Sequence, residues 1–329
     1  MIRVLIINDD SADYRQPLLH RFYDYLCNTF FDEFEFHRLN SYKYLSKIAL
    51  SRLEEYDVIW QGFRGAPLRK MAKELNESHI TVIMESGDPI LFGSQLFSEN
   101  VKGVDIAGII ARTLYGNKEL YEYKRNNRRL RYADVYYLPH CIEHIDRAGL
   151  KPIAKRTYDF CFMQKLDPYP THEYKNKLYT LLTNAISNEL EGKIAYIGET
   201  YSDTYRKILN DTKICVCSGC FYDSFVKMKY FEASEAGAVV LGENTDKLRG
   251  IYVPGKTLIE SPYRDVEAVV EILGVALRDK HKLQQMSDMA IESVNEKGSF
   301  EITAKQFCRQ LSHGLFYHLN DANNFSLMG

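Results

Sequence analysis

The stretch KMKYFEASEAGAVVLGEN, residues 227–244, decides the fold. Small and apolar side chains at positions 228, 231, 233, 236 and 237 have the spacing of a helix packed closely on a sheet. The following AVVL is the continuous apolar run of a strand buried on both faces. Gly237 lies between them, where a helix often ends in the left-handed conformation. A helix that runs directly into a buried strand is half of a βαβ unit.

The same alternation extends to both sides of this stretch. In the second half of the chain, strands are predicted at 158–164, 193–198, 213–219, 238–244 and 256–261, and helices at 171–186, 202–212 and 226–237, with two or three more up to about 319. In the first half, strands are predicted at 2–8, 33–39, 57–63 and 80–86, and helices at 14–30, 42–55, 68–78 and 104–114. Such alternation is typical of parallel sheets covered by helices. The sequence predicts an α/β protein with two Rossmann-like, doubly wound domains.

The length of 329 residues also suits two domains, because single cores stop growing at roughly 250 residues. The segment 138–158 has two prolines, a glycine and scattered charges without apolar periodicity, so we expect the linker there. We place the domains at 1–145 and 146–329, with the last helices as the part that would cross back. Ligands of such sheets bind at the carboxyl ends of the strands, so we expect them in a cleft between the two domains.

Composition excludes several classes of protein. With 45% hydrophobic and 26% charged residues and a formal net charge of −2, the chain has no overall basic field for nucleic acid. The opening apolar run ends at NDD, far short of a signal peptide or a membrane span, so we expect a cytoplasmic protein without a transmembrane segment. One local basic run, Lys124 to Arg131, is either a solvated face or a patch for a phosphorylated or polyanionic partner.

Cysteine and histidine spacings give little support for a metal site. Seven cysteines, an odd number mostly within apolar strands, suit reduced thiols in a reducing compartment. Cys215, Cys217 and Cys220 would need a fourth ligand to hold zinc, and none is apparent. His140 and His144 lack a third ligand in the same way. We therefore expect neither a metal nor a cofactor.

The decisive stretch is similar to a known family pattern. K-x-F-E-A-x-x-A-G-A-V-V-L at 229–241, then LRGIYVPGKTLI at 248–259 and DVEAVVEIL at 265–273, resembles the C-terminal domain of GT-B glycosyltransferases. The CgeB-like, family 1/4-type branch is the most similar. The resemblance covers about 158–312 and is strongest over 195–275, whereas the first half matches by architecture alone. It implies two Rossmann-like domains facing each other across a cleft, with the donor site in the second.

The resemblance also implies roles for particular residues. Lys229 takes the place of the family's basic residue, Glu232 that of its glutamate, and Gly237 that of its glycine. A carboxylate can accept hydrogen bonds from both ribose hydroxyls, which explains a glutamate in the middle of a packing helix. A lysine three residues earlier lies on the same helical face and can meet a diphosphate near the helix N-terminus. Lys227 is a second candidate for these phosphates.

Other donor-side residues follow from neighbouring loops. Lys165 would either reach a phosphate or lie in solvent. The turn from Gly198 onward resembles the family segment near the nucleobase, so Tyr201 or Tyr205 would stack on the base, or Tyr205 would pack on its own helix. Retaining relatives carry an E-x7-E pair, but Ser224 stands where the first glutamate would be. The CgeB-like branch commonly lacks that glutamate too, and the stereochemistry stays open.

Polar residues at predicted strand ends are the acceptor-side candidates. An inverting enzyme needs a general base beside the acceptor hydroxyl, and Asp88 or Asp10 is our candidate, with a helix N-cap as the alternative role of Asp10. The acceptor-side set also includes Asn8, Asp9, Arg64 and Glu85.

The implied function is a metal-independent, hexosyltransferase-like enzyme that moves a sugar from a nucleotide-diphosphate donor to a glycan, protein or other polymer. Fixed cations and a helix dipole would stabilise the leaving diphosphate. Three alternatives stay open: an inactive GT-B-like binding or structural surface protein, a nucleotide-sugar epimerase, and a DNA glucosyltransferase using the 124–131 run. No G-x-G-x-x-G follows the first strand of either half, which disfavours a dehydrogenase.

Overall fold

The computed structural model describes residues 1–8, 17–39, 53–62, 68–86, 102–111, 133–164, 173–199, 203–218, 227–243, 250–263 and 265–325. The chain forms two units, each built on one parallel sheet. The first unit comprises Met1–Pro139 together with Glu301–Gly329, and the second comprises His140–Phe300. The chain thus enters the second unit at 140 and returns to the first at 301.

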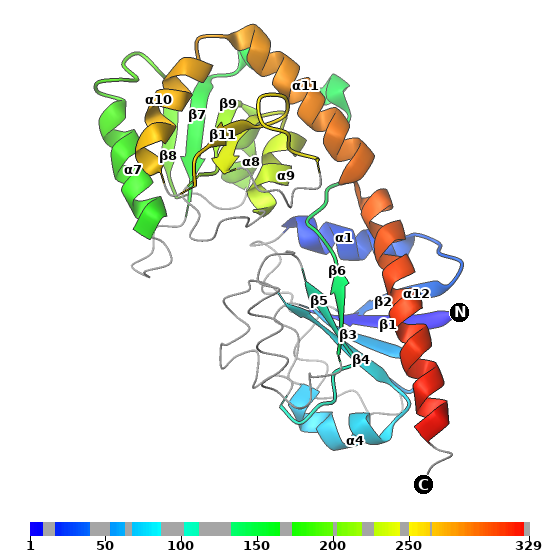
Figure 1. Ribbon diagram of the computed structural model, residues 1–329. Coiled ribbons are helices and arrows are strands. Elements are labelled where there is room, and N and C mark those ends of the chain that lie inside the picture. The colour runs from blue at the N-terminus through cyan, green and yellow to red at the C-terminus, as the bar shows by residue number, and fades with distance from the viewer. Residues whose placement is uncertain are drawn as a thin grey trace. The chain divides into compact units, whose positions relative to one another are not determined.

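The first unit contains a six-stranded sheet in the order β2-β1-β3-β4-β5-β6, with every neighbouring pair parallel (Figure 1). Its strands are β1 Ile2–Ile7, β2 Phe34–Leu39, β3 Val58–Gln61, β4 Thr81–Ser86, β5 Gly108–Ala111 and β6 Asp134–Tyr137. The described helices of this unit are α1 Pro17–Asn28, η2 Leu68–Met71, α4 Ala72–Glu77 and α12 Phe300–Phe325, which belongs to it from Glu301 onward.

The second unit contains a five-stranded parallel sheet in the order β11-β10-β9-β7-β8. Its strands are β7 Tyr158–Met163, β8 Ala195–Gly198, β9 Thr212–Val216, β10 Val239–Glu243 and β11 Ile259–Ser261. Its described helices are η5 Arg147–Gly149, η6 Ile153–Lys155, α7 Glu173–Ala185, α8 Asp203–Asn210, α9 Met228–Glu235, α10 Val266–Ala276 and α11 Lys280–Lys297. These elements confirm the predicted α/β class and its two parallel sheets.

Apolar strands flanked by helices form both cores. β9 and β10 are buried along their whole lengths, as the continuous apolar runs predicted. In the second unit, Phe160, Leu182, Ile214, Leu241 and Leu273 join one cluster in which strand side chains meet α7 and α10. Hydrophobic burial of this kind is the main stabilising contribution to such a fold.

The prediction of a helix over 104–114 was wrong. Residues 108–111 form strand β5, and the preceding 104–107 have no regular structure. Gly108 explains part of the difference, because a Cβ there would lie 2.3 Å from Cε2 of Tyr136 on the neighbouring strand. A glycine that weakens a helix here permits a close approach between two strands. Strand β6 itself was not predicted.

Candidate donor and acceptor sites

Helix α9 begins at the carboxyl edge of the second sheet. β9 ends at Val216 and α9 starts at Met228, with Lys227 as its N-cap residue in an extended conformation. Because α9 then leads back to β10, which is parallel to β9, its N-terminal end lies at the strand ends where ligands bind. Lys229 is in the first turn, and Glu232 follows one turn later on the same face.

Glu232 receives a hydrogen bond from the neighbouring helix. The Tyr205 hydroxyl of α8 donates to Glu232 Oε2 over 2.6 Å, and Lys229 Nζ lies 5.9 Å from the centre of the Tyr205 ring. Burial raises the pKa of Glu232 above its ordinary value, whereas the Tyr205 hydrogen bond and the Lys229 charge act in the opposite direction. Three predicted donor-site residues, two from α9 and one from α8, are therefore in contact.

Lys227 lies deeper than Lys229. Its side chain is buried, Nζ donates to the Cys217 carbonyl, and Nζ lies 3.8 Å from Glu243 Oε2 at the end of β10. The hydroxyl of Tyr230 donates to the Glu243 carbonyl over 3.1 Å. These contacts connect the ends of β9 and β10 to the start of α9, so Lys227 is part of the support beneath the site.

The two predicted glycines lie at opposite edges of this sheet. Gly198 is the last residue of β8, at the carboxyl edge. Gly237 follows the end of α9 with a φ of 66°, and it therefore lies at the amino edge, away from Lys229. A Cβ at Gly237 would lie 2.7 Å from Nη2 of Arg156.

The described thiols are buried beside one another. Cys161 and Cys215 are register partners on β7 and β9, and the sulfurs of Cys215 and Cys217 are 3.7 Å apart. The hydrogen bond with Cys161 raises the pKa of Cys215, and burial raises that of Cys217. Among the described residues, no group of three His, Cys, Asp or Glu side chains could hold a metal ion. Cys220 lies outside these residues, and the ring of His140 packs against Phe231.

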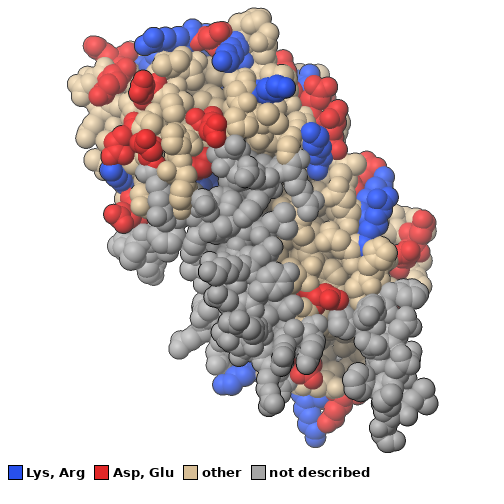
Figure 2. All heavy atoms as spheres, in the orientation of Figure 1, with Lys and Arg blue, Asp and Glu red and all other residues tan. Residues whose placement is uncertain are grey.

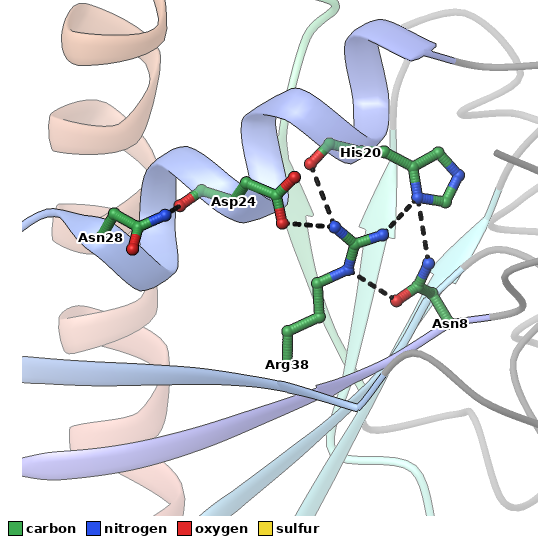
Figure 3. Close-up of polar contacts among 5 residues, drawn as sticks. All are labelled: Asn8, His20, Asp24, Asn28 and Arg38. Carbon is green, nitrogen blue, oxygen red and sulfur yellow. Dashed lines mark hydrogen bonds and ion pairs between the residues drawn. The ribbon is translucent and has the colours of Figure 1, made fainter. Parts of the chain in front are cut away.

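Polar side chains also meet at the carboxyl edge of the first sheet (Figure 3). Asn8, directly after β1, accepts from Arg38 Nε over 3.0 Å, and its amide nitrogen lies 3.1 Å from His20 Nδ1. Arg38 Nη2 lies 2.5 Å from the same His20 nitrogen, and Nη1 forms an ion pair with Asp24. Since a guanidinium only donates, His20 Nδ1 must accept, and the neutral imidazole carries its proton on Nε2. The cluster fixes the start of α1 against the strand ends.

Glu85 is buried at the same edge of the first sheet, on β4. The Tyr23 hydroxyl and Trp60 Nε1 both donate to its Oε2, over 2.5 and 3.2 Å. The Arg38 guanidinium lies 5.6 Å from the centre of the Tyr23 ring, so the Glu85 site and the Asn8 cluster are connected. Sequence reasoning named Asn8 and Glu85 but missed His20, Arg38, Tyr23 and Trp60, which no motif marks.

Several predicted site residues lie outside the described part of the chain: Asp9, Asp10, Arg64, Asp88, Lys165, Tyr201 and the basic run from Lys124 to Arg131. Over the described residues, acidic and basic side chains both lie on the face drawn in Figure 2, and neither sign dominates it. In that same part of the chain, no helix is long and apolar enough to cross a membrane.

Comparison with known proteins gives one family match and several structural matches. Residues 151–309 match the family model described as glycosyl transferase-like. No curated protein sequence matches the chain.

Three solved structures show the extent of the structural likeness. Anabaena Alr3699/HepE in complex with UDP and glucose has a TM-score of 0.61 and 11% identity, covering 95% of this chain and all of that one. An alpha-glucosyltransferase in complex with UDP-glucose and DNA containing an abasic site has a TM-score of 0.62 and 10% identity, covering 94% and 99%. Sucrose-phosphate synthase from Thermosynechococcus elongatus has a TM-score of 0.59 and 11% identity, covering 97% and 100%. At such identities the likeness is one of fold.

Proposed function

We propose that this chain, a glycosyltransferase of the GT-B fold with a glycosyl transferase-like domain over residues 151–309, transfers a sugar from a nucleotide-diphosphate donor held by α8 and α9. The observation that carries the proposal is the contact of Lys229, Glu232 and Tyr205 at the carboxyl edge of the second sheet. The Lys229 cation suits a diphosphate, the Glu232 carboxylate suits the ribose hydroxyls, and the Tyr205 ring suits a base.

The diphosphate would bind at the start of α9. The first N–H groups of a helix have no partners within it and point toward an anion, and Lys229 adds a positive charge there. Fixed donors and charges of this kind stabilise a leaving diphosphate as its charge grows. We therefore propose transfer without a required metal.

The acceptor would bind at the carboxyl edge of the first sheet, near Glu85 and the Asn8 cluster. We keep Asp88 or Asp10 as the proposed general base and a glycan, protein or other polymer as the acceptor. The solved complex of an alpha-glucosyltransferase with DNA supports a nucleic-acid acceptor as one such polymer, which the 124–131 basic run would bind. Five described cysteines, Cys27, Cys161, Cys215, Cys217 and Cys308, are free thiols, which supports a reducing compartment such as the cytoplasm.

The first experiment is thermal unfolding with UDP, ADP, GDP and their sugar conjugates, on the native protein and on Glu232→Ala. A ligand that binds the folded state stabilises it by about 2.7 kcal/mol at a hundredfold excess over its Kd. We expect one nucleotide to raise the Tm of the native protein and to lose that effect in Glu232→Ala.

Glu235→Ala is the matched control, because Glu235 is on the same helix and lies 3.9 Å from Arg206. It should keep the ligand-induced rise in Tm. If no nucleotide raises the Tm of the native protein, the chain is not a nucleotide-sugar transferase. If one nucleotide does raise the Tm, release of the nucleoside diphosphate from its sugar conjugate is measured with and without an acceptor. Faster release with the acceptor distinguishes transfer from simple binding.

A further inference from the structure

Tyr205 contacts both of the α9 side chains to which we assign donor binding. Its hydroxyl donates to Glu232 Oε2 over 2.6 Å, while Lys229 Nζ lies 5.9 Å from the centre of its ring. Base stacking, the role expected from the sequence, would not require the hydroxyl. The observed contacts give the hydroxyl a function of its own.

We propose that Tyr205 is a positioning residue, which holds the Glu232 carboxylate ready for the ribose hydroxyls and thereby makes the protein select ribonucleotides over 2′-deoxyribonucleotides. This inference rests on the proposed function, because it assigns the ribose to Glu232.

The Glu232 carboxylate keeps acceptor positions for a ligand while it is bonded to Tyr205. An ionised carboxylate has two oxygens with about four lone-pair positions, and Tyr205 uses one of them on Oε2. The remaining positions can accept from two adjacent hydroxyls. A 2′-deoxyribose offers one hydroxyl fewer, so it leaves part of this carboxylate unsatisfied.

The hydrogen bond from Tyr205 also restricts the Glu232 side chain. A glutamate loses rotamer entropy when a ligand fixes it, and this loss weakens binding. Among the described residues, Tyr205 is the hydrogen-bond donor to the Glu232 side chain. Because Tyr205 comes from α8 and Glu232 from α9, the bond fixes the carboxylate before a ligand arrives.

Tyr205 also affects the charge of Glu232. The charged or titratable groups that act on Glu232 are Tyr205 and Arg206 of α8 and Lys229 and Glu235 of α9. Burial disfavours the ionised carboxylate, and the Tyr205 hydroxyl favours it. Cys215 of β9 and Cys217, just after that strand, interact electrostatically with Tyr205 and stay neutral, because a hydrogen bond with Cys161 raises the pKa of Cys215 and burial raises that of Cys217. The tyrosine therefore supports the protonation state that accepts two hydroxyl hydrogens.

The test measures Kd by calorimetry for UDP, ADP and GDP and for the 2′-deoxy form of each. For the nucleotide that binds the native protein, we expect a clear preference for the ribose form. Tyr205→Phe should weaken binding of that form by about tenfold, the usual cost of losing a hydrogen bond to a charged group, and change the 2′-deoxy form much less. Glu232→Gln should remove the preference as well.

A pH series distinguishes positioning from general damage. Ribose binding should weaken as the pH falls through the pKa of Glu232, because the protonated acid accepts fewer hydrogen bonds. Without the Tyr205 hydroxyl that pKa rises further, so in Tyr205→Phe the weakening should begin at a higher pH. A purely structural defect would reduce affinity equally at every pH.

Tyr252→Phe is the matched control. The Tyr252 hydroxyl is buried, donates to the Tyr230 carbonyl over 2.7 Å and lies 2.8 Å from Ser234 Oγ, so it supports α9 without touching Glu232. It should leave the ribose preference unchanged. An unchanged preference in Tyr205→Phe, together with its loss in Glu232→Gln, would overturn the inference while the proposed function stands. Failure of the native protein to bind any of these nucleotides would overturn both.

Discussion

Arg156 shows how a single residue fixes the end of α9 at the amino edge of the second sheet. Its guanidinium is buried and donates to the carbonyls of Lys151, Thr212 and Ala236, each over 2.8 Å. Burial lowers the pKa of Arg156 to about 10, which leaves it charged at neutral pH. The end of α9 is thereby tied to β9 and to the segment before β7.

The first stability prediction concerns Gly237, which lies against Arg156. Gly237 and Gly255 both have positive φ angles, 66° and 75°, but a Cβ would touch Arg156 only at Gly237 and would meet nothing within 4 Å at Gly255. We expect Gly255→Ala to cost roughly 1 kcal/mol of the free energy of unfolding, and Gly237→Ala to cost roughly 1–3 kcal/mol more. Urea unfolding of both variants checks the difference. Equal losses would show that Arg156 moves aside without cost.

The sequence predicted site residues that stand close together in one motif, but it could not predict contacts between distant segments. Lys229, Glu232 and Gly237 stand within one short motif, so local spacing and capping rules apply to them. Tyr205 meets Glu232 across 27 residues, and Arg156 meets Ala236 across 80. Contacts at such separations depend on how helices pack on the sheet, which no local pattern encodes.

At the scale of elements, side-chain caps begin α10 and α11, the two helices directly after β11. Asp265 accepts from the Ala268 amide over 3.1 Å at the start of α10, and Asp279 accepts from the Lys282 amide over 2.9 Å at the start of α11. The capped α10 then places Val269 and Leu273 in the core. An exposed ion pair between Lys177 and Glu267 adds little, because solvent screens it.

The second stability prediction concerns the cap of α10. Replacing Asp265 by alanine leaves the Ala268 amide without its side-chain acceptor, and we expect a loss of about 0.5–2 kcal/mol. Asp265→Asn keeps an acceptor oxygen at the same place and should lose much less. Far-UV circular dichroism in urea measures both. An asparagine variant as unstable as the alanine variant would argue against a capping role.

Elements were predicted well where a continuous apolar run stands beside a clear helix pattern. The apolar runs in β9 and β10 predicted strands, and both strands are buried along their lengths. Over 104–111, a run of apolar residues fits a strand or a helix equally well. Whether the segment forms a strand depends on the close approach of Gly108 to Tyr136 of β6, which the local sequence does not show.

At the scale of the molecule, α12 completes the first unit. Phe307 packs on Trp60 with ring centres 5.1 Å apart, and both rings are fully buried. The Gln310 side chain pairs with the backbone of Tyr137, accepting from its amide over 2.8 Å and donating to its carbonyl over 3.0 Å. Gly314 lies against the Tyr136 side chain, and a Cβ there would be 2.3 Å from the Tyr136 hydroxyl oxygen.

The third stability prediction tests this packing. Phe307→Ala should destabilise the first unit by roughly 3–5 kcal/mol, because it leaves a cavity beside Trp60. Trp60 is the one tryptophan of the sequence, so its fluorescence reports unfolding of the first unit. Leu273→Ala, a comparable deletion in the second core, should leave the fluorescence midpoint unchanged. A common shift in both variants would mean that the two units unfold together.

The return of the chain to its first unit also fixes an order of events on the ribosome. The strands of that unit are synthesised first, yet the side chains that cover Trp60 and pair with Tyr137 come only after the whole second unit has been translated. At translation rates of about 5–20 residues per second, Trp60 and the Tyr137 backbone stay uncovered by α12 for on the order of ten seconds or more. The second unit, continuous in sequence, can fold as soon as it emerges, so the first unit is completed after the second although its strands are translated earlier.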